Sequence, residues 1–403
     1  MYQAQRQKEE ETMKNKSLQS RVIVFILCTL IIFSSATPAS AYTSPIEMTL
    51  QESSELVALS FMRNSLDESV EISSTTPFFD LDGNVTAYCV SFEIQEKPSG
   101  YVLISLINPD NPIVEFSFEG PGLVATITQQ EQTSSLKKGS QNQIIYLGTG
   151  TFYLQKGDNV LYDVISNKGY STSQISATYD AVLNQNGIVQ YGTNVDIGDG
   201  ILDWEDASID SSSIEKISGF GSGTDYWLMD DFSSGNVCSP TCATNVMWYW
   251  GVQRGRSWAV ETEDYYGEEL SGFDLADAIF TSMSSYMSTI PPLGTLELFL
   301  HDAYVNFLGL RGTNYELYTL NENDYSSFTD AIDDGYPIHT MLRNEFIFDT
   351  GHDVMTIGYG ESTKGTDYLF VMDGWYPYGR FVDFDYYPIV KGLAVWVGSR
   401  AIK

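Results

Sequence analysis

Basic residues are scarce in this chain. Its 403 residues include 21 Lys and Arg against 53 Asp and Glu, which gives a formal net charge of −32. A surface of this sign repels the phosphates of nucleic acids and of anionic membranes, so neither is an expected partner. Hydrophobic residues make up 43% of the chain and aromatic residues 13%. This is enough for packed cores in two or three domains and excludes a disordered protein.

Long apolar runs are missing after the N-terminus. The run Val22–Phe33 has 12 residues, follows a basic stretch and precedes the small residues Ala39-Ser40-Ala41. As a helix it would reach about 18 Å, too short for a bilayer core of about 30 Å. This succession of segments is typical of an export signal. We therefore expect residues 1–41 to be a cleaved signal peptide, and the mature protein, which would begin near Tyr42, to be secreted.

Cysteines are also few. Of the four, Cys28 lies in the predicted signal peptide, which leaves Cys89, Cys238 and Cys242. Three cysteines do not build the disulfide framework of small exported domains, and an odd count leaves at least one thiol outside any disulfide. Cys89 lies in a predicted strand and Cys242 inside a predicted helix, where packing is the expected role.

The first half of the chain predicts two successive regions. A helix over residues 50–64 and strands over 85–94, 100–107 and 113–118, with a turn at 97–100, predict a small α+β module spanning residues 42–122. Residues 123–217 predict a β-rich extension and an acidic linker, with a hairpin around residues 156–159. The segment Asp80–Asn84 lacks the ligand spacing of a calcium loop, so a hairpin turn is the better interpretation. The acidic residues between 196 and 206 are likewise interpreted as solvated.

The last region, residues 218–403, has helices first and strands second, which is the order of an α+β domain. Helices are expected over residues 238–250, 262–288, 295–308 and 328–334, and strands over 338–343, 353–359, 368–372 and 393–397.

The segment Asn236–Trp250, NVCSPTCATNVMWYW, predicts a loop that turns into a buried central helix, because nearly every side of it is apolar. Ser239 suits the N-cap and Pro240 the first helical turn. Cys238 would then lie where the helix begins, and the helix dipole favours the thiolate, which is the nucleophilic form of cysteine. Taken alone, a cysteine beside a core helix is more commonly a packing residue.

Two residues of the last region can complete a site with Cys238. His352 opens a predicted strand, and Asp373 closes the next strand of the same hairpin. Opposed residues of an antiparallel hairpin share a constant index sum, and a sum of 725 would place His352 opposite Asp373, with the turn centred between Ser362 and Thr363. Any odd sum keeps the two on one face of the sheet. A carboxylate there can hold the imidazole in the tautomer that serves a thiol.

Together the motifs CSPTCATNVMWYW, GHDVMTIGYG and VMDGW resemble those of papain-like cysteine peptidases, in the branch that includes the bacteriocin-processing (double-glycine leader) peptidases. The resemblance covers about residues 225–403. It implies a papain-like fold with Cys238 as nucleophile, His352 as general base and Asp373 as the residue that orients the histidine. The oxyanion-binding glutamine of papain-like peptidases has no counterpart here, so the Asn236 side chain and the Cys238 backbone N–H are the candidate donors. No cofactor or metal is implied.

The segment GYVLISLINPDNPIVEFSFEG is similar to the inhibitory pro-regions of streptopain-like cysteine peptidases. This similarity implies a precursor in which residues 42 to about 217 fold separately and cover the site until they are removed. The Lys137-Lys138 pair and residues 196–217 are candidate maturation sites. The expected partners are a peptide or protein substrate and the protein's own N-terminal region as inhibitor.

Other hypotheses stay open at this point. Acyl transfer or amide hydrolysis of a transglutaminase-like or cell-wall type uses the same three residue types, so fold analogy does not decide between them. A catalytically inactive exported surface protein is a third hypothesis. A metal site built from Cys238, Cys242 and a histidine falls short of the four ligands of a closed zinc shell. Of the remaining histidines, His301 is expected to be structural and His339 lies on a predicted strand.

Overall fold

The computed structural model describes the chain from residue 48 onward. The described residues are 48–66, 69–122, 124–125, 143–146, 152–155, 159–163, 169–173, 175, 201–218, 226–232, 237–260, 269–289, 295, 297–343, 352–386 and 389–400. The predicted signal peptide, Lys137-Lys138, residues 196–200 of the acidic stretch and Asn236 lie outside them. Residues 49–403 cluster as one compact unit. Within the described ranges, every helix falls short of the length and apolarity that a membrane crossing needs.

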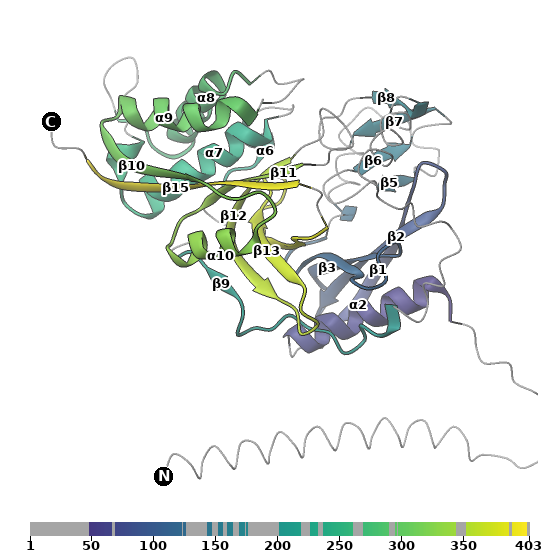
Figure 1. The fold of residues 1–403 in the computed structure, drawn as a ribbon. Helices are drawn as coiled ribbons and strands as arrows, with labels where there is room; N and C mark the ends of the chain where they lie inside the picture. The colour runs from purple at the N-terminus through teal and green to yellow at the C-terminus, as the bar shows by residue number, and fades with distance from the viewer. Residues whose placement is uncertain are drawn as a thin grey trace, which may run out of the picture. The chain divides into compact units, whose positions relative to one another are not determined.

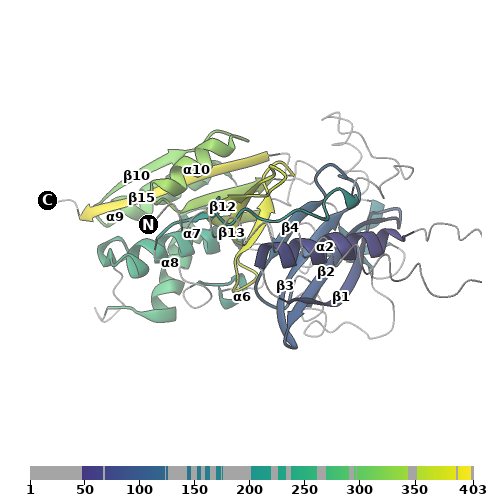
Figure 2. The same cartoon turned by 90° about the horizontal axis from the view of Figure 1, so that it is seen from below.

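The first described region is a helix on an antiparallel meander. Its elements are α2 (Leu50–Leu66), β1 (Glu71–Phe79), β2 (Val85–Ile94), β3 (Lys97–Ser105) and β4 (Ile113–Ser117). The helix buries Val57, Phe61 and Met62 against the sheet because these residues recur at helical spacing on one side. Figure 2 shows α2 lying along the meander strands. The predicted helix and the three predicted strands are confirmed, and β1 is a strand that the analysis of the sequence missed.

Two turns of this region differ in how well they were predicted. Asp80 accepts hydrogen bonds from the backbone N–H groups of Asp82 (2.9 Å) and Asn84 (2.8 Å), which confirms a hairpin turn there. The predicted turn at residues 97–100 is wrong. The chain reverses at Gln95 and Glu96, both at positive φ (52° and 62°), and β3 begins immediately afterwards.

The second half of the chain is a mixed α+β region that is compatible with a papain-like domain. Its helices are α6 (Met229–Phe232), α7 (Cys238–Trp248), α8 (Gly272–Tyr286), α9 (Leu300–Leu310) and α10 (Tyr325–Asp333). Its strands are β10 (Thr313–Thr319), β11 (Ile338–Arg343), β12 (His352–Glu361), β13 (Asp367–Met372), β14 (Arg380–Asp383) and β15 (Ile389–Arg400). Every predicted strand of this region is confirmed to within a few residues, whereas β10 and β14 were not predicted.

The strands of both regions belong to one continuous sheet. Its order is β10-β15-β11-β12-β13-β14-β4-β3-β2-β1-β5-β6-β7-β8, and β9 pairs with β12 (Figure 1). The short strands are β5 (Ile144–Tyr146), β6 (Phe152–Gln155), β7 (Val160–Asp163), β8 (Gly169–Ser171) and β9 (Glu215–Lys216). The regions meet where β14 pairs with β4. The domain boundaries at residues 42, 123 and 218 stay predictions, and the structure adds a direct strand pairing between the regions that they separate.

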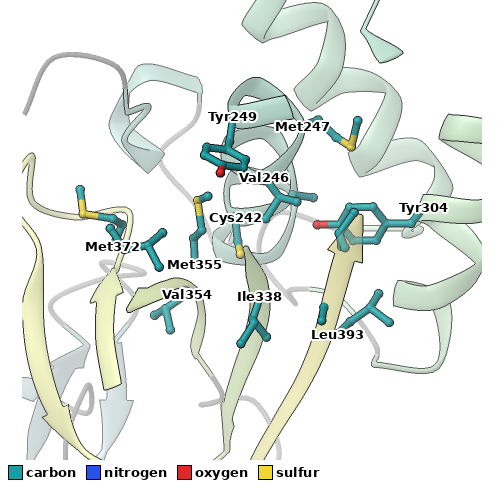
Figure 3. Close-up of a cluster of buried hydrophobic side chains, with 14 of the residues drawn as sticks. Cys242, Val246, Met247, Tyr249, Tyr304, Ile338, Val354, Met355, Met372 and Leu393 are labelled. Carbon is teal, nitrogen blue, oxygen red and sulfur yellow. The ribbon is translucent and has the colours of Figure 1, made fainter. Parts of the chain in front are cut away.

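The core of the second region surrounds α7. Cys242, Val246 and Met247 of this helix pack among residues of α8, α9, β11, β12 and β15 (Figure 3). Because α7 is buried on nearly all sides, the prediction of a central helix is confirmed. Figure 1 shows α7, α8 and α9 together on one side of these strands, with α10 on the other side.

Candidate functional site

The candidate nucleophile begins the central helix. Cys238 is the first residue of α7, is partly exposed and lies outside any disulfide. Pro240 lies in the first turn, as predicted, where its missing N–H leaves no helical hydrogen bond unmade. The first N–H groups of a helix lack partners within the helix and carry its positive dipole end, which stabilises a thiolate at this position.

The predicted N-cap is wrong. Val237, not Ser239, occupies the N-cap, and no side chain caps the helix. Ser239 is the second helical residue, and its side chain is buried with Oγ 3.4 Å from Nε2 of His339 on β11. The serine turns inward because α7 packs directly on the sheet, a tertiary contact that overrides the local capping preference.

The histidine lies on the hairpin of β12 and β13, whose register differs from the predicted one. Near the turn the index sum is 728, and beyond a bulge between Thr356 and Gly358 it becomes 727. The predicted sum of 725 is therefore wrong, but the sum at the site end is odd, as one shared face requires. The bulge changes the index sum from even to odd, and it thereby puts His352 and Asp373 on the same face of the sheet. It falls where β9 pairs with β12, and a Cβ on Gly358 would lie only 2.4 Å from the carbonyl oxygen of Glu215.

His352 is held by the main chain and by an aromatic ring. Its Nε2 lies 2.8 Å from the backbone carbonyl oxygen of Asp373, and its ring stacks on that of Trp375 at 3.8 Å between centroids, with 14° between the planes. A carbonyl oxygen only accepts, so Nε2 must carry the hydrogen. In the neutral imidazole this leaves Nδ1 as the acceptor, which is the form a general base needs.

The Asp373 side chain acts on the backbone instead of on the imidazole. Its Oδ1 accepts hydrogen bonds from the N–H groups of Trp375 (2.8 Å) and Tyr376 (3.0 Å), and its Oδ2 lies 3.0 Å from Nη2 of Arg380. Burial raises the pKa of the Asp373 carboxyl above its ordinary value, and the Arg380 guanidinium opposes that shift. The structure thus brings His352 and Asp373 together, but the expected contact between imidazole and carboxylate is replaced by one to the Asp373 carbonyl.

A second polar cluster lies buried beneath the first turn of α7. Nε2 of His339 is 3.2 Å from Oδ2 of Asp353 and also faces Ser239, while its Nδ1 is 3.1 Å from the hydroxyl of Tyr304. His339 and Asp353 are 0% and 4% exposed. This cluster joins α7, α9, β11 and β12 and supports the segment that carries Cys238.

The other candidate residues lie away from this arrangement or outside the described ranges. Cys89 and Cys242 are buried, and burial raises the pKa of both thiols, so their predicted packing roles are confirmed. His301 lies on the exposed side of α9 with Nδ1 3.6 Å from Asp302, so it has no role in a packed core. Asn236, the candidate oxyanion donor, is not among the described residues.

Three residues of the site escaped the analysis of the sequence. Trp375 was within the motif VMDGW, and an Asp-Gly turn followed by tryptophan was the available signal. No local pattern in the sequence marked Arg380 or Asp353 as site residues, because their partners lie on other segments of the chain.

Comparison with known proteins supports this part of the chain as the functional region. Residues 224–397 match the Peptidase_C39 like family. No curated protein matches the chain. The family match contains Cys238, His352, Asp373 and Trp375, and it begins after the helix and meander of the first region.

Proposed function

We propose that this protein is a secreted cysteine peptidase that uses Cys238, His352 and Asp373, and the match of residues 224–397 to the Peptidase_C39 like family supports this proposal. It hydrolyses peptide bonds of a peptide or protein substrate. Export follows from the signal-like residues 1–41, so the chain is made as a precursor that loses at least this segment.

In the proposed mechanism Nδ1 of His352 takes the proton of the Cys238 thiol. The thiolate attacks the substrate carbonyl carbon, and the imidazolium returns the proton to the leaving amine. A thioester remains, and water that His352 deprotonates then hydrolyses it. The Asp373 carbonyl accepts the Nε2–H hydrogen bond throughout, so that Nδ1 is the nitrogen that accepts and returns the proton. The backbone N–H of Cys238, at the start of the helix, donates to the oxyanion, and the Asn236 side chain is the proposed second donor.

The observation that carries the proposal is that two neighbouring groups fix the orientation and the tautomer of the His352 ring. A hydrogen bond of 2.8 Å to a carbonyl and a stacked indole leave the ring little freedom, and they select one tautomer. A histidine kept only for packing gains nothing from such selection. The strand that carries it packs against the helix that Cys238 begins.

The test is turnover by the purified mature protein beside Cys238→Ala and Cys242→Ala. Casein and cell-wall peptides are the substrates, and amine incorporation into casein is followed in parallel. We expect Cys238→Ala to lower peptide hydrolysis by at least about 10³-fold, and Cys242→Ala to retain it because that thiol is a buried packing group. Equal hydrolysis in the wild type and in Cys238→Ala would refute the peptidase. Amine incorporation without hydrolysis would establish the acyl-transfer alternative.

A further inference from the structure

A buried ion network joins the first region to the support of His352. Arg380 of β14 is 2% exposed and lies between two carboxylates. Its Nη1 is 2.7 Å from Oε1 of Glu115, on β4 of the first region, and its Nη2 is 3.0 Å from Oδ2 of Asp373. The hydroxyl of Tyr101, on β3, donates to the same Glu115 oxygen. Two strands of the first region thus orient the arginine that the Asp373 carboxylate faces.

The Asp373 carboxylate in turn shapes the turn that holds His352. Its hydrogen bonds to the N–H groups of Trp375 and Tyr376 close this turn over Gly374, which has a φ of 80° that favours glycine. The same turn presents both groups that contact His352, namely the Asp373 carbonyl and the Trp375 ring. A displacement of the carboxylate would therefore move the imidazole.

We propose that Glu115 is a positioning residue for His352, acting through Arg380 and Asp373, and that the module of residues 48–122 is a lasting part of the enzyme. This inference rests on the proposed peptidase function. It differs from the expectation that the region is an inhibitor removed at maturation.

The contact between the two regions is built like a core. Phe116 of β4 stacks on Phe381 of β14 at 4.8 Å between centroids and 13° between planes. The Tyr368 hydroxyl donates to the carbonyl of Ile113 (2.7 Å), and both Tyr368 and Phe381 belong to the core beneath α2. Removing the module would expose this apolar surface and leave the buried Arg380 without one of its two carboxylates, an arrangement that is costly in a low-dielectric interior.

The first test measures the alkylation rate of Cys238 by iodoacetamide against pH, together with kcat and KM, in Glu115→Ala and Glu115→Gln. Asp206→Ala is the matched control, because the Asp206 carboxylate, from the segment between the two regions, also forms an ion pair with the second region, at 2.5 Å from Nζ of Lys364, but is largely exposed. We expect Glu115→Ala to lower kcat and the alkylation rate at pH 7 about tenfold, with KM within about twofold, because a misplaced base slows proton transfer without touching substrate contacts. Glu115→Gln, which keeps the hydrogen-bonding shape but lacks the charge, should remain about threefold below the wild type, and Asp206→Ala should match the wild type.

Alkylation curves of both Glu115 variants that superimpose on the wild-type curve would overturn the positioning role. The same holds if Glu115→Ala fails to fold while Glu115→Gln folds and behaves as the wild type. The alkylation curve does not require turnover, so it remains decisive if the wild type proves not to hydrolyse peptides, and the two failures stay distinguishable.

The second test places a recognition sequence for a specific protease between residues 122 and 143 of the full chain. After cleavage we expect the two fragments to elute together in gel filtration and Cys238 alkylation to stay within about twofold of the uncut value. Separation of the fragments with a rise in activity would show a removable inhibitor and overturn the lasting role.

Discussion

His352 and His339 lie on neighbouring strands, are both buried and are both hydrogen-bonded, yet their surroundings differ in kind. His352 faces a carbonyl through Nε2, which selects the neutral tautomer whose Nδ1 is a proton acceptor. His339 uses Nε2 toward both Ser239 and Asp353, and Nδ1 toward the Tyr304 hydroxyl. Every ring nitrogen of His339 is thus engaged by a group from inside the core.

The buried cluster has the residue types of a serine hydrolase triad, but its geometry and access exclude that role. In a triad the acid and the nucleophile contact opposite nitrogens of the imidazole. Here Ser239 and Asp353 share one nitrogen, and Ser239 is 2% exposed. Cys238, one residue earlier, is partly exposed. The comparison teaches that the direction and access of the side chains, not their residue types, distinguish the proposed catalytic site from the buried cluster.

The largest expected effect separates the two histidines. His352→Ala should lower peptide hydrolysis by about 10³-fold or more, since it removes the base, with a modest change in the free energy of unfolding. His339→Gln should do the reverse: lower that free energy by about 1–3 kcal/mol through its buried partners, and keep activity within about threefold. The measurements are kcat/KM and urea unfolding of both variants. A loss of activity in His339→Gln as large as that in His352→Ala would contradict the purely structural role of His339.

Thiol labelling sharpens the same contrast between surface and interior. Cys238 should react with an epoxide or iodoacetamide reagent at pH 7 at least about 100-fold faster than Cys89 and Cys242. Burial raises the pKa of these two thiols, so their thiolates are rare in the folded state, and they should label only when the chain unfolds or at high pH. Mass spectrometry of digested, labelled protein gives the three rates. Labelling of Cys242 at the rate of Cys238 in the folded protein would contradict the assignment.

The smallest expected effect concerns the pH dependence of stability and contrasts two buried carboxyl groups, those of Asp373 and Asp383. Asp373 faces Arg380, whereas Asp383 accepts a hydrogen bond from the neutral Asn111 amide (2.6 Å), and burial raises the pKa of Asp383 to about 7. The unfolded pKa is about 3.9, so the folded chain holds this proton to a higher pH. Its contribution to stability is fully present below about pH 4 and is lost as pH rises through about 7. Asp383→Asn should therefore be more stable than the wild type at pH 8, with the difference shrinking toward pH 4.

Urea unfolding of both proteins between pH 4 and pH 8 checks this expectation. Parallel pH curves for the wild type and Asp383→Asn would show that folding does not raise the pKa of Asp383.

The elements were predictable because each rests on local pattern. The apolar spacing of residues 50–64, the alternation of the strands and the loop-to-helix change at Cys238 all survive in the structure. The residue types of the site were also visible, since Cys238, His352 and the Asp-Gly-Trp turn lie in recognisable motifs. The predictions that proved wrong concern strand register and side-chain direction. They are the index sum of 725 for the hairpin of His352 and Asp373, the N-cap role of Ser239, and the contact of the Asp373 carboxylate with the imidazole.

From the sequence alone one could determine which residues are capable of the chemistry and on which kind of element each lies, because propensity and periodicity act over a few neighbours. Only the tertiary structure decided that Asp373 holds His352 through its carbonyl, that a bulge beside β9 restores the shared face, and that Glu115 reaches Arg380 from another region. These facts depend on pairings between residues up to 265 positions apart. Such pairings are selected by the packing of the whole sheet, which no local pattern in the chain encodes.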